Sequence, residues 1–302
     1  MGFIRRWFFC TLLWSLAALP AAAQEGKGDV VYVPTPQITV DEMLRMARVG
    51  PGDFLIDLGS GDGRIVITAA KQFGARGLGV DLDSYLLELA REAATKQGVS
   101  ERAQFVEQNL FETDLSQATV ITSYLLPELN ERLRPKLLAL KPGTRVVAHD
   151  YDMGEWHPDE QKTLNVPEKT VGALGKSHIF FYIVPATIAG KWESRIFTGR
   201  RSAVYQFDFD QRFQQVSGEA RVDGNPARLP PFKLRGDRIG FEADLPQGAW
   251  LVRHRFRGRV KEDAIEGTVA IGAHKPLPWK AQRAARAGLR SGALDTTAGV
   301  LR

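Results

Sequence analysis

The chain has 302 residues, of which 44% are apolar and 25% are charged, and it contains 29 glycines and 16 prolines. This composition is typical of a folded globular protein and excludes an intrinsically disordered chain, a collagen and a protein with many membrane spans. The length favours about two domains, each large enough to bury a core.

Residues 1–23 have the order expected of a secretory signal peptide. Arg5 and Arg6 precede an apolar run from Trp7 to Leu19, and a run of small residues ends at Ala23. The apolar run is shorter than the ~20 residues that span a bilayer. We therefore expect cleavage near Ala23 and a periplasmic or secreted mature chain. Membrane association would arise only if the segment stayed uncleaved as an inner-membrane anchor.

The predicted mature chain has no cysteine, because Cys10, the single cysteine, lies within the apolar run. Disulfides, a thiol nucleophile and a Cys-ligated zinc are therefore excluded, and we expect no metal site. The mature chain keeps 38 basic and 35 acidic residues, which is a net charge of +3. Because this excess is small and dispersed along the chain, it indicates no nucleic-acid partner.

From about residue 41 to residue 183 the sequence alternates short apolar segments with amphipathic ones. The pattern predicts strands at 54–57, 77–80, 104–106, 119–123 and 145–148, helices at 64–73, 85–93 and 126–140, and an antiparallel edge strand at 179–184. Strands that alternate with helices are typical of a parallel sheet covered on both faces. We therefore expect a doubly wound, mostly parallel α/β domain over residues 24–188.

Beyond Pro185 the pattern changes to apolar residues that alternate with polar ones. Three segments alternate in this way, with glycine-containing turns between such runs: 205–209, 238–243 and 250–257, with turns at 223–224 and 236–237. This predicts an antiparallel meander. We expect it to form a β-sheet or small barrel over residues 189–280 that docks a partner or substrate. Residues 281–302 are rich in Ala, Gly and Arg, and we expect a flexible tail there.

The strongest chemical signal is the segment D-L-G-S-G-D-G at residues 57–63, where the first predicted strand turns into a helix. Gly59 and Gly61 allow a sharp turn and let a ligand lie on the main chain, near the amides of the helix N-terminus. Asp81 follows Gly61 by twenty residues, at the end of the second strand, where a carboxylate can accept both hydroxyls of a ribose. The arrangement predicts a nucleoside site, and the alternative is a tight turn beside a solvated aspartate.

The spacing of the glycines and the nearby charges indicate which nucleoside binds. Dinucleotide sites have the pattern G-x-G-x-x-G, whereas this loop has G-x-G-x-G preceded by Asp57. Asp57 and Asp62 would repel a pyrophosphate, but they suit a ligand that carries an ammonium and a sulfonium. A nicotinamide-dependent oxidoreductase is therefore a less favoured alternative.

Together these features resemble motif one of the class I, Rossmann-like methyltransferases that depend on S-adenosylmethionine (SAM), over roughly residues 30–184. The resemblance implies SAM as the cofactor and a Rossmann-like methyltransferase sheet. It also implies that Gly59, Ser60 and Gly61 contact the methionine part of SAM, with Asp57 near its ammonium.

The same resemblance assigns the adenosine part of SAM to two further positions. Asp81 would bind the ribose. Asn109, in the segment Q-N-L-F after the third strand, falls where the family usually has an acid or amide that recognises the adenine amino group.

A narrower likeness involves the segments Y-V-P-T-P at 32–36, D-E-M-L at 41–44 and Y-L-L-P-E at 124–128. With the glycine loop, they resemble a branch of bacterial and mitochondrial protein-lysine methyltransferases related to the histone-lysine methyltransferases of the telomeric-silencing type. By this resemblance Tyr32 and Thr35 would close over the SAM carboxylate. The alternative is that the prolines only make a stiff, extended entry segment.

Methyl transfer is an in-line displacement, so that positioning of the two reactants can supply most of the catalysis. The segment after the fourth strand lacks the Asn or Asp followed by Pro-Pro that is common in methyltransferases of nucleobases, and Tyr124 in this segment is our candidate for the wall of the acceptor site. His149 or Asp150, after the fifth strand, could assist deprotonation of a lysine ammonium. The alternatives are packing for Tyr124 and, for the polar loop 149–157, capping and solvation or a metal site.

The sequence thus predicts a SAM-dependent methyltransferase that acts on a lysine of a protein substrate or on a small amine. The alternative from another class is a catalytically silent SAM-fold module in the cell envelope that uses its β domain for interaction.

Overall fold

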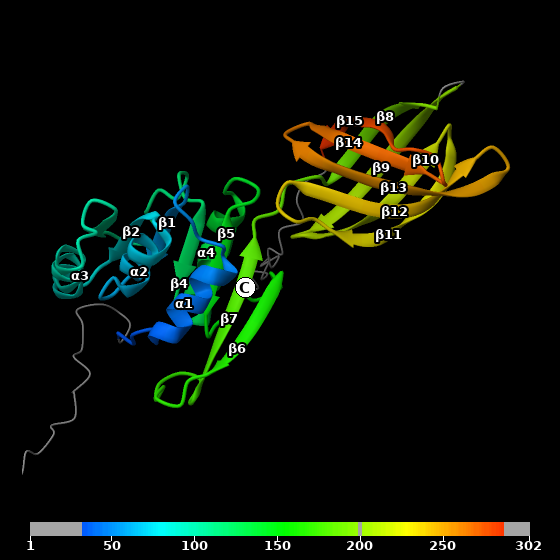
Figure 1. The fold of residues 1–302 in the computed structure, drawn as a ribbon. Coiled ribbons are helices and arrows are strands. Elements are labelled where there is room, and N and C mark those ends of the chain that lie inside the picture. The colour runs from blue at the N-terminus through cyan, green and yellow to red at the C-terminus, as the bar shows by residue number, and fades with distance from the viewer. Residues whose placement is uncertain (1–31, 199–200, 287–302) are drawn as a thin grey trace, which may run out of the picture.

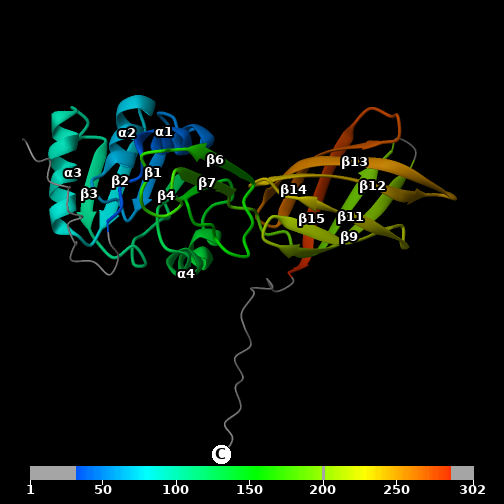
Figure 2. The same cartoon turned by 90° about the horizontal axis from the view of Figure 1, so that it is seen from below.

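The computed structural model describes residues 32–198 and 201–286, which form two units that lie side by side (Figure 1). The first unit is a seven-stranded sheet with helices on both faces, and the second is an eight-stranded antiparallel sheet. We call the second unit the rolled sheet, because it curves around its own core (Figure 2). The predicted signal peptide, residues 1–23, lies outside the described residues.

The first unit follows the predicted alternation of strands and helices. Its strands are β1 (Phe54–Leu58), β2 (Arg76–Asp81), β3 (Ala103–Glu107), β4 (Val120–Ser123), β5 (Arg145–His149), β6 (Glu160–Asn165) and β7 (Lys176–Ile183). Its helices are α1 (Gln37–Met46), α2 (Arg64–Phe73), α3 (Ser84–Lys96) and α4 (Pro127–Leu138). The strand order is β3-β2-β1-β4-β5-β7-β6, in which β1 to β5 are parallel and β7 is antiparallel to both of its neighbours. This confirms the doubly wound, mostly parallel sheet.

Helices cover both faces of the sheet because its strands are apolar on both faces. Leu55 of β1 packs in one core with α1, α2 and α3, whereas its neighbour Ile56 packs in the other core with α4. Figure 2 shows α1 and α2 on one side of the sheet and α4 on the other. Because β1, β2, β4 and β5 run parallel, their carboxyl ends meet at one edge of the sheet.

Strand β6 is absent from the sequence-based prediction. Its segment, E-Q-K-T-L-N, is polar and mostly exposed, and it pairs only with β7 at the edge of the sheet. Because the segment has no alternation of apolar and polar residues, the sequence gives no signal for a strand, and main-chain hydrogen bonds to β7 define it. Its connection to β7, residues 166–175, lies beside the carboxyl end of β5, because Lys169 contacts the Asp150 carboxylate and an added Cβ at Gly172 would lie 2.8 Å from it.

The rolled sheet confirms the predicted antiparallel C-terminal unit. Its strands are β8 (Gly190–Phe197), β9 (Ser202–Arg212), β10 (Gln215–Val222), β11 (Asn225–Lys233), β12 (Arg238–Gln247), β13 (Trp250–Lys261), β14 (Ala264–Ile271) and β15 (Leu277–Arg286). They are paired in the order β11-β10-β9-β8-β15-β14-β13-β12.

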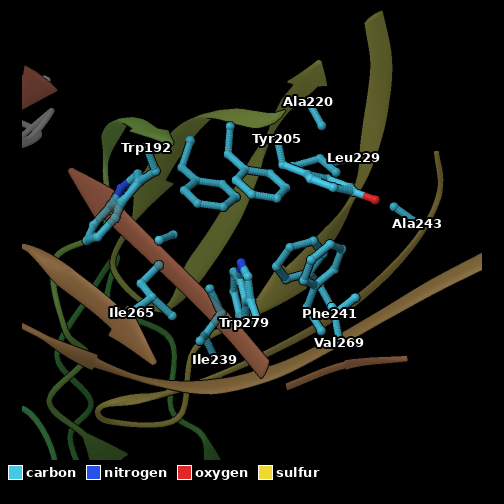
Figure 3. Close-up of a cluster of buried hydrophobic side chains, with 14 of the residues drawn as sticks. Trp192, Tyr205, Ala220, Leu229, Ile239, Phe241, Ala243, Ile265, Val269 and Trp279 are labelled. Atoms are coloured by element: carbon cyan, nitrogen blue, oxygen red, sulfur yellow. The ribbon is translucent and has the colours of Figure 1, made fainter. Parts of the chain in front are cut away.

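Aromatic side chains fill the interior of the rolled sheet. Rings from separate strands point toward one another (Figure 3), and Phe241 stacks on its cross-strand partner Phe256 with 4.6 Å between ring centroids. Such pairs contribute roughly 0.5–1.5 kcal/mol beyond their buried area. Two strands also approach closely at Gly267, where an added Cβ would lie 2.0 Å from the Arg257 carbonyl oxygen.

The expected flexible tail, residues 281–302, is wrong for its first part, because β15 continues to Arg286. Ala281 is fully buried, since little room is left between β15 and the core. Arg283 lies over the Trp192 ring at 4.2 Å and donates to the Ala189 carbonyl (2.7 Å). Ala281 and Arg283 are therefore part of the packed sheet, although the low hydropathy of this segment predicted a flexible tail. Residues 287–302 lie outside the described part.

The two units meet at the edge of the first sheet that is opposite the carboxyl ends of β1 to β5. Gly143, just before β5, pairs with Val184, just after β7 (2.8 Å), and the Ala186 amide donates to the Gly236 carbonyl of the rolled sheet (2.9 Å). Gln214 also donates to the His157 carbonyl (2.7 Å). Within the described residues, no helix combines the length and apolar character required to cross a bilayer.

Candidate active site

A cavity of about 290 Å³ opens at the carboxyl ends of β1, β2 and β4. Of the predicted site residues, those that line it are Tyr32, Thr35, Asp57, Gly59, Asp81, Asn109 and Tyr124. Those that do not line it are Ser60, Gly61, His149 and Asp150. The structure therefore brings the predicted cofactor residues of three strand ends together, but it places the two predicted proton acceptors elsewhere.

The glycine loop lets the segment before α1 pack against it. Gly59 and Gly61 have φ values of +77° and +50°, which favour glycine. A Cβ at Gly61 would lie 2.4 Å from the Tyr32 ring, so a side chain there would displace the ring. The absence of a side chain at Gly61 therefore serves the approach of Tyr32, while the adjacent Gly59 lines the cavity.

Arg64, which the sequence analysis did not single out, fixes this segment over the loop. It donates to the Thr35 carbonyl (2.9 Å) and forms an ion pair with Asp62 (2.6 Å). Hydrogen bonds and the charge of Arg64 outweigh burial and lower the pKa of the Asp62 carboxyl. Asp62 is thus neutralised by the chain itself, which leaves Asp57 as the carboxylate available to a cationic ligand.

Asp57 is a buried carboxylate on the cavity wall. It is 2% exposed and accepts a hydrogen bond from the Thr122 hydroxyl of the neighbouring strand β4 (2.7 Å). Burial raises the pKa of this carboxyl to about 7, and the charges of Asp81 and Asp62 add to that effect. A ligand ammonium would reverse it, because an opposite charge favours the ionised form.

Asp81 is held in place by main-chain donors at the end of β2. One carboxylate oxygen accepts from the Gly61 amide (2.8 Å), and the other accepts from the amides of Leu82 (2.8 Å) and Asp83 (3.0 Å). A carboxylate has about four acceptor sites, so capacity remains for a ligand hydroxyl. The bond to Gly61 also links the ends of β1 and β2 on either side of the cavity.

Asn109 lies on the cavity wall with its side chain already engaged. Its side-chain oxygen accepts from the Phe111 amide (2.9 Å), which fixes the turn that follows β3. The Phe111 ring also lines the cavity and carries the Arg132 guanidinium 3.8 Å from its centroid. Phe111 and Arg132 are lining residues that the sequence reasoning missed, because their pairing joins a loop to α4.

The side chain of Ser60, a predicted cofactor contact, faces the sheet. Its amide donates to the Val80 carbonyl (3.0 Å), and its side chain points toward β2, where an added Cβ at Gly79 would lie 2.6 Å from the Ser60 hydroxyl oxygen. The side chain of Ser60 therefore packs between the loop and β2 instead of facing the cavity.

His149 lies behind the cavity wall and is fully buried. Its ring nitrogens contact the hydroxyls of Thr35 (3.2 Å) and Ser177 (3.0 Å). Burial lowers the pKa of this imidazole to about 3, assisted by the Lys169 cation. The side chain is therefore neutral, and its contacts fit a positioning role for Thr35 better than proton transfer.

Asp150 is likewise engaged away from the cavity. Its carboxylate contacts the Lys169 ammonium, accepts from the Tyr124 hydroxyl (3.1 Å) and accepts from the His178 amide (3.1 Å). These hydrogen bonds and the neighbouring positive charge lower the pKa of the Asp150 carboxyl despite burial. Lys169 was missed by sequence reasoning because it lies in the polar β6–β7 connection and only the fold brings it to Asp150.

Tyr124 is the point where this buried network reaches the cavity. Its ring lies 4.0 Å from the His149 ring, centroid to centroid, and its hydroxyl is tied to Asp150. His149 and Asp150 therefore fix the position of the Tyr124 ring on the side away from the cavity, while the residue itself lines the cavity. Its predicted role as the wall of the acceptor site stays a prediction.

These features fit SAM. Asp57 is a buried carboxyl without a cationic partner, which a ligand ammonium would ionise, and Asp81 is a fixed acceptor on the adjacent strand end. The buried Tyr32 hydroxyl lies beside Asp62 but makes no hydrogen bond of good geometry to any described residue. Across residues 32–198 and 201–286, no group of three or more His, Cys, Asp or Glu side chains is arranged to hold a metal ion.

Comparison with known proteins agrees with this geometry. The model of the ANTKMT methyltransferase domain family matches residues 57–160. A protein-lysine N-methyltransferase of Saccharolobus islandicus (strain REY15A) is 48% identical over 133 residues, which are 43% of this chain and 83% of that protein.

Two further similarities cover different shares of the matching proteins. The adenine nucleotide translocase lysine N-methyltransferase of Mus musculus is 34% identical over 149 residues, which are 48% of this chain, so the chain spans less than two thirds (64%) of that relative. A solved structure, described as an RNA methyltransferase from Salinibacter ruber in complex with S-adenosyl-L-homocysteine, is 46% identical. The match covers 52% of this chain and 96% of that one, with a TM-score of 0.46.

The raised pKa of Asp57 predicts that the carboxylate which would bind the SAM ammonium lowers the stability of the empty protein. Because the folded state binds the Asp57 proton more tightly than the unfolded chain, the empty protein loses stability as pH rises through about 7. Asp57→Asn should therefore raise the melting temperature of the empty protein at pH 8 by roughly 2–8 °C. The change should be much smaller at pH 5, and affinity for SAM should fall by at least about tenfold.

Asp62→Asn is the matched control, measured by the same thermal unfolding at both pH values. It removes a carboxylate whose pKa is lowered by Arg64, so it should lower the melting temperature at pH 8. If Asp57→Asn also destabilised the empty protein at pH 8, the destabilisation attributed to the buried, ionised Asp57 carboxylate would be refuted.

Proposed function

The chain belongs to the SAM-dependent protein-lysine N-methyltransferase family, and from that premise we propose that it transfers the methyl group of SAM to a lysine side chain of a protein. The proposal rests on one observation: a single cavity is lined both by Asp57, a buried carboxyl without a cationic partner, and by Asp81, a carboxylate placed to accept ribose hydroxyls. The fold places both at the carboxyl edge of the sheet, and the related lysine methyltransferases give the class of acceptor.

SAM supplies an electrophilic methyl group on a sulfonium. Asp57 would hold its ammonium, Asp81 would hold its ribose, and the turn of Asn109 and Phe111 would border its adenine. Tyr32, held over the glycine loop, would cover the methionine end. In this arrangement the chain fixes the position of the cofactor and needs no covalent intermediate.

The acceptor enters a partly apolar space beside Tyr124. Leu125 and Leu129 line the same cavity. An amine that leaves water for apolar surroundings loses its proton more easily, because burial disfavours the charged form. With His149 neutral and Asp150 paired to Lys169, we assign proton removal to this desolvation and to solvent, and we assign orientation to the Tyr124 ring.

Transfer of labelled methyl groups tests the choice of acceptor. The protein should label cellular protein supplied with methyl-labelled SAM, and digestion followed by mass spectrometry should place the label on lysine. The matched control is the same protein fraction after acetylation of its lysines, which turns each amine into a non-nucleophilic amide and should lower the label accepted at least about tenfold. Equal labelling of the blocked fraction, or label only on small amines, would contradict a protein-lysine acceptor.

Substitution of Tyr124 separates the role of its ring from that of its hydroxyl. Tyr124→Ala should lower kcat/KM for the acceptor by about 100-fold through lost positioning, with the Kd of SAM changed by less than about threefold.

Tyr124→Phe keeps the wall, so it should retain activity within about fivefold while losing about 1 kcal/mol of stability with the bond to Asp150. Steady-state kinetics and SAM titration check both variants. A Tyr124→Phe enzyme as impaired as Tyr124→Ala would show instead that the hydroxyl takes part in the chemistry.

A further inference from the structure

The far end of the rolled sheet carries apolar side chains that the fold does not use. β8 and β12 both start beside the junction with the first unit, where Ala186 is bonded to Gly236. Their other ends, Phe197 and Gln247, therefore lie at the end of the rolled sheet that points away from the first unit (Figures 1 and 2). The end of β8, the start of β9 and the β12–β13 turn share that end.

Three large apolar side chains are exposed at this end of the rolled sheet. Phe197 ends β8 and is 65% exposed, whereas Trp250 and Leu251 begin β13 and are 77% and 69% exposed. The contrast within the chain is sharp, because the other described tryptophans, Trp156, Trp192 and Trp279, are at most 1% exposed. We call Phe197, Trp250 and Leu251 the apolar tip.

Basic side chains lie toward the same end of the rolled sheet as the apolar tip. Arg195, Arg201, Arg255 and Lys275 are exposed near the same end, and we call these four the basic collar. Among the described residues, none of the four has an acidic partner within ion-pair distance.

The nearby acids are already engaged by the fold. Asp244 is held by two hydrogen bonds from Arg253 (2.6 and 3.0 Å), and Asp223 accepts from the Val204 amide (2.8 Å). Glu242, the cross-strand partner of Arg255, also contacts Arg253 (3.4 Å). The basic collar and Arg253 are five cations against the three acids Asp223, Glu242 and Asp244, so the excess charge is positive and favours an anionic surface.

We propose that the apolar tip and the basic collar dock the protein onto an anionic lipid bilayer. Trp is enriched at bilayer interfaces, where its ring sits among the headgroups, and basic residues near the surface are attracted by anionic lipids. A protein partner fits this end less well. Three side chains from two separate strands offer far less than the roughly 800 Å² that a stable protein interface buries on each partner.

Docking at the apolar tip would also set the distance between the bilayer and the methyltransferase cavity. β13 has 12 residues, so it spans about 40 Å at ~3.3 Å per residue. The bilayer and the first unit would lie at opposite ends of the rolled sheet. The rolled sheet would then act as a spacer, with the cavity directed at acceptors held away from the lipid surface. Docking itself does not depend on which acceptor is methylated.

Intrinsic fluorescence gives a direct test, because Trp250 is the one exposed tryptophan among the described residues. The protein should be used without residues 1–23, whose apolar run would itself bind lipid, and this removal leaves every described residue in place. Vesicles of phosphatidylcholine with 30% phosphatidylglycerol should bind the protein in sedimentation and shift its emission to the blue. Pure phosphatidylcholine vesicles should bind it at least about fivefold more weakly.

Paired variants make the test specific. Trp250→Ser combined with Leu251→Ser should lower binding to the anionic vesicles by at least about tenfold, with the melting temperature and the methyl transfer in solution unchanged. Leu174→Ser is the matched control, since Leu174 is 72% exposed but lies in the β6–β7 connection, and it should bind as the parent does.

Arg255→Gln combined with Lys275→Gln should weaken binding to anionic vesicles and reduce its dependence on salt. Absence of binding to anionic vesicles, equal binding to neutral ones, or unchanged binding of the Trp250 and Leu251 double variant would overturn the proposal.

Discussion

Burial of the Asp57 carboxylate is the constraint around which the site is organised. A desolvated carboxylate is unfavourable unless it is hydrogen-bonded and paired with a cation. The chain supplies the hydrogen bond, from Thr122 on β4, but it supplies no cation, because Arg64 is committed to Asp62. The protein therefore leaves Asp57 without a cation, and in the proposed function the ammonium of SAM supplies it, while Asp81 on the adjacent strand end would accept the ribose.

The remaining parts of the site hold that arrangement rigid. The segment before α1 is tied to the glycine loop by Arg64 and to the end of β5 by the contact of Thr35 with His149. The wall of the acceptor space is tied from behind by the pair of Asp150 and Lys169. Residues with catalytic potential, a histidine and an aspartate, thus serve to position others. This suits a displacement reaction in which geometry supplies most of the rate.

The sequence predicted the features that depend on local spacing. The glycine loop, Asp81 and the alternation of strands and helices are each encoded within some twenty residues, and the structure places Gly59 and Asp81 on the predicted cavity. Features that depend on contacts between distant segments could not be found in this way. His149 was predicted as a base because its burial cannot be read from the sequence, and Lys169 was missed because only the fold brings it to Asp150. The second half of β15 was hidden because Ala281 and Arg283, instead of large apolar residues, make its inward contacts.

The central claim is that Asp57 becomes ionised when it meets the ammonium of SAM, and calorimetric titration of the protein with SAM at pH 6 tests it most directly. With a carboxyl pKa of about 7 in the empty cavity, most molecules carry the proton at this pH. Titration in buffers of different ionisation enthalpy should therefore show nearly one proton released for each SAM bound. Binding without proton release, or no binding at SAM concentrations of about 1 mM, would contradict the account.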